Sequence, residues 1–300
     1  MMKRNRNAIR VSPSYRVFTV AAYLLIVGWT FICISPFVHV LSVSMSASKY
    51  ADSFQVGLWP REFTTEYYQK ALTNPQILSS LLISVKRTVL GVVVELVVTI
   101  LASYPLSKDK KEFPGRGIAA AYFIFCMVFG GGLIPTYIIV SNELKLADSV
   151  WALVLPGAVN IGNIILMMNF MRQLPKELEE SAMLDGCGYF RTLIQIIIPL
   201  SINSILTIVM FVTISHWNAW FDGLIYMRSV ERYPMSTFLY NVRNKLENIK
   251  TMEDMELVTQ YSQQGLIMTY VAICTVPVLI LYPVLQKYVK KGLTVGSVKG

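Results

Sequence analysis

The chain has 300 residues, of which 54% are hydrophobic and 15% are charged, and its mean hydropathy is +0.51. This composition excludes an ordinary water-soluble domain, because soluble proteins of this length carry less apolar surface. The formal net charge of +9 fits the basic loops of a membrane protein and indicates no nucleic-acid partner.

Apolar runs predict six transmembrane helices. A helix needs about 20 apolar residues to cross the hydrocarbon of a bilayer, and there it satisfies its own backbone hydrogen bonds. The six runs occupy residues 17–46, 79–107, 117–140, 150–171, 198–226 and 265–285. They are too long and too uniformly apolar for barrel strands. We therefore expect an all-α membrane protein, a single transmembrane domain over residues 1–300.

The distribution of basic residues predicts the orientation. About sixteen of the 27 Lys and Arg residues fall in the N-terminus, the loops after the second and fourth spans, and the C-terminus, against about nine in the other loops. Both termini are therefore expected in the cytoplasm, with residues 286–300 as a cytoplasmic tail. The start "MMKRNRNAIR" resembles the charged end of a signal peptide, but the apolar run after it is too long, which favours a retained first span.

The chain offers little for catalysis or metal binding. Its cysteines stand singly, and it has two histidines, His39 and His216. No disulfide framework or metal-ligand spacing is visible. A phosphate-binding loop of the G-x-x-x-x-G-K-[ST] type is also absent from the sequence. We therefore predict that this chain is not an enzyme and holds no cofactor or metal itself.

The loop between the fourth and fifth spans contains an acidic segment, "EESAMLDGCGYFRTLIQIIIPLS", at residues 179–201. Pro175 suits the first turn of a helix, acidic residues follow near the positive helix end, and Gly186 is suited to end it. The pattern predicts a short cytoplasmic helix over residues 175–186, with Leu178 and Ala182 on one narrow face and Ser181 and Asp185 beside it.

A helix of about three turns is not stable alone in water, so this one needs a surface to dock on. One interpretation is a connector that lies on its own protein or on lipid headgroups. A helix on lipid is usually basic on its polar face, whereas this one is acidic. A protein partner is therefore the better interpretation.

The same segment resembles the EAA signature of bacterial ABC importer membrane subunits. Glu180, Ser181 and Ala182 are followed by Gly186, and then by Ile196, Ile198 and Pro199 at the family's spacing. Ser181 stands where the family has Ala, and Ile198 stands where it has Leu. "FGGGLIPTYII", "WALVLPGAVNIGNIILMMNFM" and the tail "KGLTVGSVKG" resemble the carbohydrate-importing branch. The likeness extends from about the second span to Gly300.

The resemblance implies a multi-pass subunit of the bacterial cytoplasmic (inner) membrane. It implies a second, homologous six-span subunit as the other half of the pathway, and two cytoplasmic ATPase subunits that hold ATP and Mg. An extracytoplasmic binding protein would deliver an oligosaccharide or polysaccharide. The acidic helix would then be the coupling helix, a lever between ATPase closure and span five. Residues implied in this coupling are Glu180, Ser181, Ala182, Asp185, Gly186 and Lys299.

Polar residues near the outer end of span five are candidates for the sugar pathway. Trp217, Asn218, Trp220 and Asp222 combine aromatic faces with hydrogen-bonding groups, although tryptophans there also suit an interfacial belt. In span four, Asn160 and Asn163 either hold helices together or face a wet pathway.

Span two carries three ionisable residues, Glu95, Lys86 and Arg87. Such groups inside a membrane usually face a bundle interior or a transport route. Lys86 and Arg87 can instead extend to the outer interface. If they reach the pathway, an acidic sugar is easier to explain.

Other features complete the prediction. The glycines at 130–132 are expected to permit a kink or close helix approach. The outer loop from about residue 227 to 264, together with the first outer loop, is expected to dock the binding protein. Two rival functions stay open: an ion-gradient-driven secondary transporter, which usually needs carboxylates at mid-membrane, and an intramembrane hydrolase, which needs a paired nucleophile and base.

Overall fold

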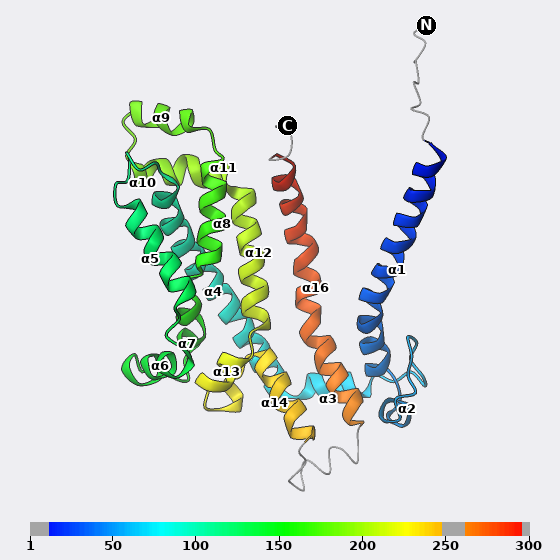
Figure 1. Ribbon diagram of the computed structural model, residues 1–300. Coiled ribbons are helices and arrows are strands. Elements are labelled where there is room, and N and C mark those ends of the chain that lie inside the picture. Colours follow the sequence, from blue (N-terminus) through cyan, green and yellow to red (C-terminus); the bar gives the residue numbers. More distant parts are fainter. Residues whose placement is uncertain (1–11, 248–261, 296–300) are drawn as a thin grey trace. The chain divides into compact units, whose positions relative to one another are not determined.

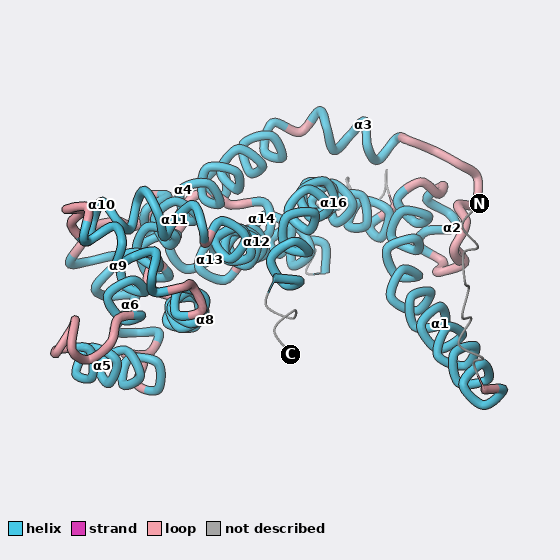
Figure 2. The backbone as a smooth tube through the Cα atoms, turned by 90° about the horizontal axis from the view of Figure 1, so that it is seen from above, coloured by secondary structure: helices cyan, strands magenta, loops and turns pink. Residues whose placement is uncertain are grey.

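The computed structural model describes residues 12–247 and 262–295. Throughout these residues helices are joined by loops (Figure 2), with one isolated β-bridge between Ser46 and Phe63. The chain divides into two compact units, residues 1–69 with 251–272 and residues 70–250 with 273–300. A single domain over residues 1–300 stays a prediction.

The first unit contains α1 (Pro13–Ser44), α2 (Ser48–Asp52), the start of α3 (Glu66–Thr73) and the first part of α16 (Gln263–Val295). Ser12 caps α1 by accepting a hydrogen bond from the backbone N–H of Tyr15. The apolar window of α1 has a mean hydropathy of 2.3 and buries none of its residues within the chain. A helix that is apolar all round and uncovered by its own chain needs lipid or an apolar partner around it.

The second unit is built around α4 (Pro75–Ser107), which Asn74 caps at its start. Helices α8 (Ile161–Arg172) and α12 (Ile202–Asn218) pack side by side with α4 (Figures 1 and 2). Apolar side chains from these helices and from the π-helical turn η3 (Leu193–Ile197) form the core. The core members are Ile100, Tyr104, Met167, Met171, Leu193, Ile197, Ile205, Ile208 and Val212.

Three helices in the described residues, α1, α4 and α16, are long and apolar enough to cross a membrane, and the number rises to six if each of three bent pairs is one span. This confirms the all-helical fold with up to six spans. The helices in the bent pairs are α5 (Arg116–Val128) with α6 (Leu133–Ile138) and η1 (Ile139–Glu143); α7 (Val150–Val154) and η2 (Leu155–Gly157) with α8; and α10 (Tyr189–Thr192), η3 and α11 (Ile198–Leu200) with α12.

Several span boundaries differ from the expected ones. Span three, expected over 117–140, bends by 104° where Gly132 has a φ of +83°, so the expected kink at the glycines is present. Span five, expected over 198–226, bends by 80° near Ser201 and ends at Asn218, because Ala219 has extended backbone. Helix α4 starts before residue 79, and α16 continues past residue 285.

Two groups of short elements lie at opposite ends of the second unit (Figure 1). At one end α9 (Lys176–Leu184) crosses the bundle close to α10. At the other end lie α6, α13 (Phe221–Tyr226), η4 (Val230–Arg232) and α14 (Met235–Glu247). The positive-inside rule places the α9 end in the cytoplasm and the α14 end outside.

Candidate functional site

Helix α9 is the segment expected to be the coupling helix, and its end is closed by two backbone hydrogen bonds. The N–H of Cys187 donates to the carbonyl of Ala182 at 2.9 Å, and the N–H of Gly186 donates to that of Met183 at 3.0 Å. This pair of bonds is a Schellman motif, which requires a left-handed residue after the helix. Gly186 has a φ of +82°. The prediction that Gly186 ends the helix is therefore confirmed.

The two faces of α9 have different surroundings. Glu180, Ser181 and Asp185 are exposed, and Leu184 is 89% exposed. Ala182, in contrast, is buried within this chain. The structure thus differs from the expectation that Ala182 faces a partner. Helical spacing groups Leu178 with Ala182, but packing against the bundle decides which side of the helix turns inward.

Side chains attach α9 to the residues at the end of α4. Lys108, which follows α4 directly, forms an ion pair with Glu179, and its ammonium lies 3.9 Å from a Glu112 carboxylate oxygen. The same ammonium lies 4.4 Å from the ring centroid of Tyr104. Burial lowers the pKa of Lys108, whereas the carboxylate of Glu112 raises it. Lys108 is therefore a buried cation that depends on these neighbours.

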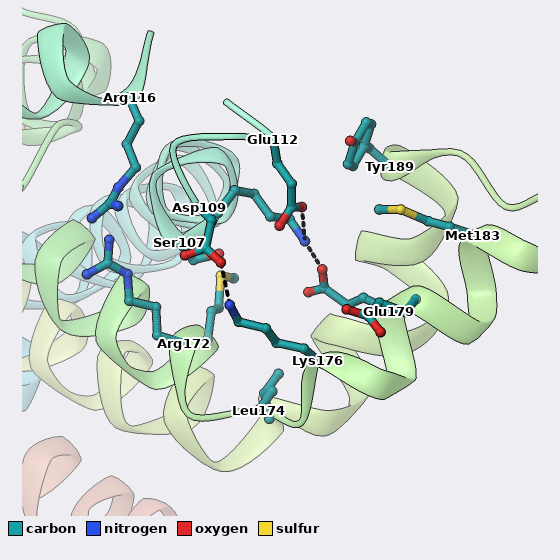
Figure 3. A pocket seen from close by; sticks show the side chains of 13 residues that line it. Ser107, Asp109, Glu112, Arg116, Arg172, Leu174, Lys176, Glu179, Met183 and Tyr189 are labelled. Atoms are coloured by element: carbon teal, nitrogen blue, oxygen red, sulfur yellow. Dashed lines mark hydrogen bonds and ion pairs between the residues drawn. The ribbon is translucent and has the colours of Figure 1, made fainter. Parts of the chain in front are cut away.

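Two further contacts reach the same end of α4. Lys176 forms an ion pair with Asp109, and a guanidinium N–H of Arg172 donates to the carbonyl of Leu106 at 3.1 Å. The hydrogen bond from Lys176 holds the pKa of Asp109 below its usual value, and it raises the pKa of Lys176. Lys108, Asp109, Arg172 and Lys176 border a cavity of about 520 Å³ between α9 and the bundle (Figure 3). Its other lining residues include Arg116, Met183 and Tyr189.

A second polar cluster lies among the spans of the bundle. The side-chain amide of Asn163 on α8 donates to Glu95 on α4 at 2.8 Å. Nε2 of His216 on α12 lies 3.6 Å from the other oxygen of Glu95. The imidazole fits because residue 91 is a glycine, at which a Cβ would lie 2.4 Å from that Nε2. These contacts join α4, α8 and α12 through one buried carboxylate.

A third cluster lies near the α13 end of the bundle. Arg87, whose side chain is 2% exposed, forms an ion pair with Asp222 and donates to the carbonyl of Ala219 at 2.9 Å. One Asp222 oxygen also accepts the N–H of Gly223 at 2.8 Å. Lys86, the neighbour of Arg87, is exposed. Arg87 is thus paired within the chain, whereas Lys86 is exposed.

The remaining expected site residues lie in different surroundings. Trp217 is buried, and its indole N–H donates to the carbonyl of Cys274 at 3.2 Å. Trp220 stacks on Tyr240 at a centroid distance of 4.2 Å, and Asn218 is exposed. Asn160 caps α8 by accepting the N–H of Asn163 at 3.1 Å. Lys299 lies outside the described residues. Whether any of these residues contacts sugar stays a prediction.

Sequence reasoning missed the pair of Lys108 and Glu179. A weak signal was available, because a lysine directly after a helix suits the negative helix end. Its partner could not be identified, since the two residues lie on different elements. Among the described residues, no group of three or more His, Cys, Asp or Glu side chains is placed to hold a metal ion.

Up to six candidate spans and a short helix exposed at one end fit a membrane transport subunit. Residues 76–295 match the model of the family described as "Binding-protein-dependent transport system inner membrane component". The chain belongs to this family. It is an inner-membrane permease subunit of the ABC transporter type, and the two rival functions are thereby set aside.

The chain is also similar to individual transport proteins. Protein LplC of Bacillus subtilis is 36% identical, with 95% of this chain and 96% of LplC covered. The polygalacturonan/rhamnogalacturonan transport system permease protein YtcP of the same species is 34% identical, with 95% and 99% covered. Among solved structures, the chain is similar to one from a bacterial ABC transporter involved in the import of the acidic polysaccharide alginate. That match has a TM-score of 0.82 and 28% identity, and covers 93% of this chain and 98% of the other.

Proposed function

We propose that this chain forms half of the translocation pathway of an ATP-driven, binding-protein-dependent importer of sugar polymers. The observation that carries the proposal is α9, a short helix at the end of the bundle predicted to be cytoplasmic, with an exposed outer face. A related six-span subunit supplies the other half of the pathway. Two separate ATPase subunits hold ATP and Mg.

The exposed face of α9 suits insertion into a groove on an ATPase subunit. Ser181, Leu184 and Asp185 lie at i, i+3 and i+4 spacing on the exposed side. An amphipathic helix laid into a groove uses anchors at this spacing. In this arrangement Leu184 is the apolar anchor, while Glu180 and Asp185 accept charge-assisted hydrogen bonds from the partner. Ala182 supports the same helix from the inside.

The substrate we propose is an acidic oligosaccharide or polysaccharide. Galacturonan and alginate, the polymers in the descriptions of two similar transport proteins, both carry carboxylate groups on their sugar rings. Lys86 is an exposed cation on α4, whereas Arg87 is already paired with Asp222. Of the two basic residues Lys86 and Arg87, we therefore assign Lys86 to the attraction of an acidic sugar.

The aromatic and amide residues near the outer end of α12 are our candidates for contact with sugar rings. Asn218 and Trp220 are both exposed, and Trp220 presents a ring pair with Tyr240. Pockets for small polar ligands combine apolar and aromatic faces with a few hydrogen-bonding groups. The extracytoplasmic binding protein would dock on the outer surface, to which α14 belongs.

Reconstituted vesicles test this function. The chain, its partner membrane subunit and the ATPase are placed in vesicles with the binding protein outside and ATP inside. We expect ATP-dependent uptake of labelled trigalacturonate that greatly exceeds uptake of maltotriose, a neutral control with the same number of sugar units. Equal uptake of both sugars would contradict the acidic substrate. Uptake without ATP, driven by an ion gradient, would contradict the importer itself.

A further inference from the structure

Both ion pairs of α9 reach the residues that directly follow α4. Glu179 pairs with Lys108, and Lys176 pairs with Asp109. Arg172, the last residue of α8, donates to the Leu106 carbonyl beside these pairs. Backbone connections lead from α9 to α8 and α10 instead, and both of these belong to bent spans. Side-chain contacts thus join α9 to a helix that is remote from it in sequence.

The other end of α4 is attached to the segment around η4 and α14. The hydroxyl of Ser79 donates to the carbonyl of Glu231 at 2.9 Å, and the N–H of Met235 donates to the hydroxyl of Ser84 at 2.7 Å. The amide of Gln76 donates to the carbonyl of Val230 at 2.5 Å. Three consecutive turns of α4 therefore hold the region that begins α14.

Helix α4 is suited to carry displacement between these two ends. It is one helix of 33 residues, about 50 Å long at 1.5 Å per residue. Pro105 in its last turn has no backbone N–H to donate, but the helix continues through it to Ser107. The spans that continue the chain on either side of α9 are bent by 55° and 80°. A continuous hydrogen-bonded helix transmits displacement along its axis better than a span with a break, because the break is free to bend.

The contacts at the inner end differ in burial. The side chain of Lys108 is 7% exposed and that of Glu179 is 19% exposed, whereas Lys176 and Asp109 are 66% and 58% exposed. Ion pairs between exposed side chains contribute little, because water screens them. Removal of one partner from a buried pair leaves an uncompensated charge and is strongly unfavourable. Lys108 and Glu179 are therefore the main connection.

We propose that Lys108 and Glu179 are positioning residues that fix α9 to α4, so that α4 carries displacement of α9 to η4 and α14 at the opposite end of the bundle. The proposal rests on the proposed function in assigning the ATPase to α9 and the binding protein to the α14 end. From the sequence we expected α9 to act on span five, whereas this proposal connects α9 to span two, which is α4.

The test uses the full transporter in vesicles and measures the ratio of binding-protein-stimulated to basal ATPase activity. Lys108→Met and Glu179→Gln should each lower this ratio about tenfold, which corresponds to about 1.4 kcal/mol. The basal activity and the amount of co-purified ATPase should stay unchanged, because the outer face of α9 is intact. Lys108→Arg should keep the ratio near that of the wild type, since it keeps the charge.

Lys176→Met is the matched control, because Lys176 also pairs with a carboxylate beside the end of α4 but is exposed. Its ratio should change by no more than about twofold. The double variant Lys108→Met with Glu179→Met should not fall below either single variant, since it leaves no unpaired buried charge. An unchanged ratio in the single variants, or an equal loss in Lys176→Met, would overturn the proposal. So would parallel loss of co-purified ATPase, which would mean that the pair only shapes α9.

A distance measurement separates failure of this inference from failure of the proposed function. Spin labels are placed on Lys111→Cys and on the native Cys187, with Cys33, Cys126 and Cys274 changed to Ser. Between the ATP-free and ATP-bound complexes the label distance should stay constant in the wild-type background and change in Lys108→Met. A label distance that changes equally in both backgrounds would refute the connection between α9 and α4. This result does not depend on whether any sugar stimulates the ATPase, so it is separate from the test of the proposed function.

Discussion

A substitution at Gly186 tests whether the end of α9 must keep its left-handed turn. Gly186 has a φ of +82°, and its N–H and that of Cys187 close the helix by binding the carbonyls of Met183 and Ala182. Gly186→Ala adds one methyl group and opposes this φ. Gly186→Asn is the matched control, because asparagine also occurs at this position of helix ends.

The expected magnitude follows from the backbone alone. A Cβ built at residue 186 meets no atom within 4 Å, so alanine causes no collision within this chain. An L-residue other than glycine is disfavoured in the left-handed region by about 1–2 kcal/mol. This free energy lowers the ratio of the closed to the open helix end by a factor of about 5–30. If the ATPase binds the closed form, its apparent affinity falls by up to the same factor, because it follows the fraction of helix ends that are closed.

The assay is binding of the purified ATPase subunit to the membrane complex, followed by sugar-stimulated ATPase activity and uptake in vesicles. Gly186→Ala should weaken binding by up to about 30-fold, and Gly186→Asn much less. Gly186→Tyr adds bulk beside the docking face and should nearly abolish uptake. All three variants should accumulate normally in the membrane, because the turn is exposed and remote from the buried core.

Two results would refute this reasoning. Equal loss in the alanine and asparagine variants would show that the absence of a side chain matters, and not the backbone conformation. Wild-type uptake and full sugar stimulation in Gly186→Tyr would show that α9 is only a connector, and would remove the main structural support for coupling through this helix.

Four further predictions concern other parts of the chain. Gly91→Ala should place its Cβ against the ring of His216 and destabilise the protein by about 1–3 kcal/mol, measured as a lower unfolding temperature in detergent; an unchanged temperature would contradict the close packing. Ala182→Asp should bury a carboxylate behind α9 and reduce co-purified ATPase, whereas Ala182→Ser, which keeps the side chain small and uncharged, should retain it; equal retention would show that the inner face is not needed. Trp217→Ala and Asn218→Ala should reduce sugar-stimulated ATPase activity more than basal activity, and equal losses would make both residues structural. Deletion of residues 292–300, partly outside the described residues, should weaken ATPase retention without affecting membrane insertion, and unchanged retention and uptake would refute a role for the tail.

The features that were predictable from the sequence are local ones. Six apolar runs identify the spans because transfer into lipid depends on the composition of each segment. Gly186 ends α9 and Gly132 marks the bend of span three, since each has a positive φ that favours glycine. The acidic helix after span four and the family resemblance were likewise readable from residues close together in the chain.

Contacts between distant segments were decided by the tertiary structure. The sequence leaves open whether Arg87 faces the bundle or extends to the outer interface, and it does not show that Asp222 pairs with Arg87 or that Asn163 binds Glu95. The sequence places Ala182 on α9 and implies contact with a partner, whereas in the structure Ala182 is buried within this chain. It also extended span five beyond Asn218, since hydropathy does not record where backbone becomes extended.

The pair of Lys108 and Glu179 shows the limit most clearly. Local sequence identifies each residue as charged and close to a membrane end, and this description fits many residues of the chain. Their pairing depends on how α9 folds back across the end of α4, and therefore on the packing of three spans. Hydropathy and backbone preference act over a few neighbouring residues, whereas the partner of a buried charge is selected by the whole fold that removes it from water.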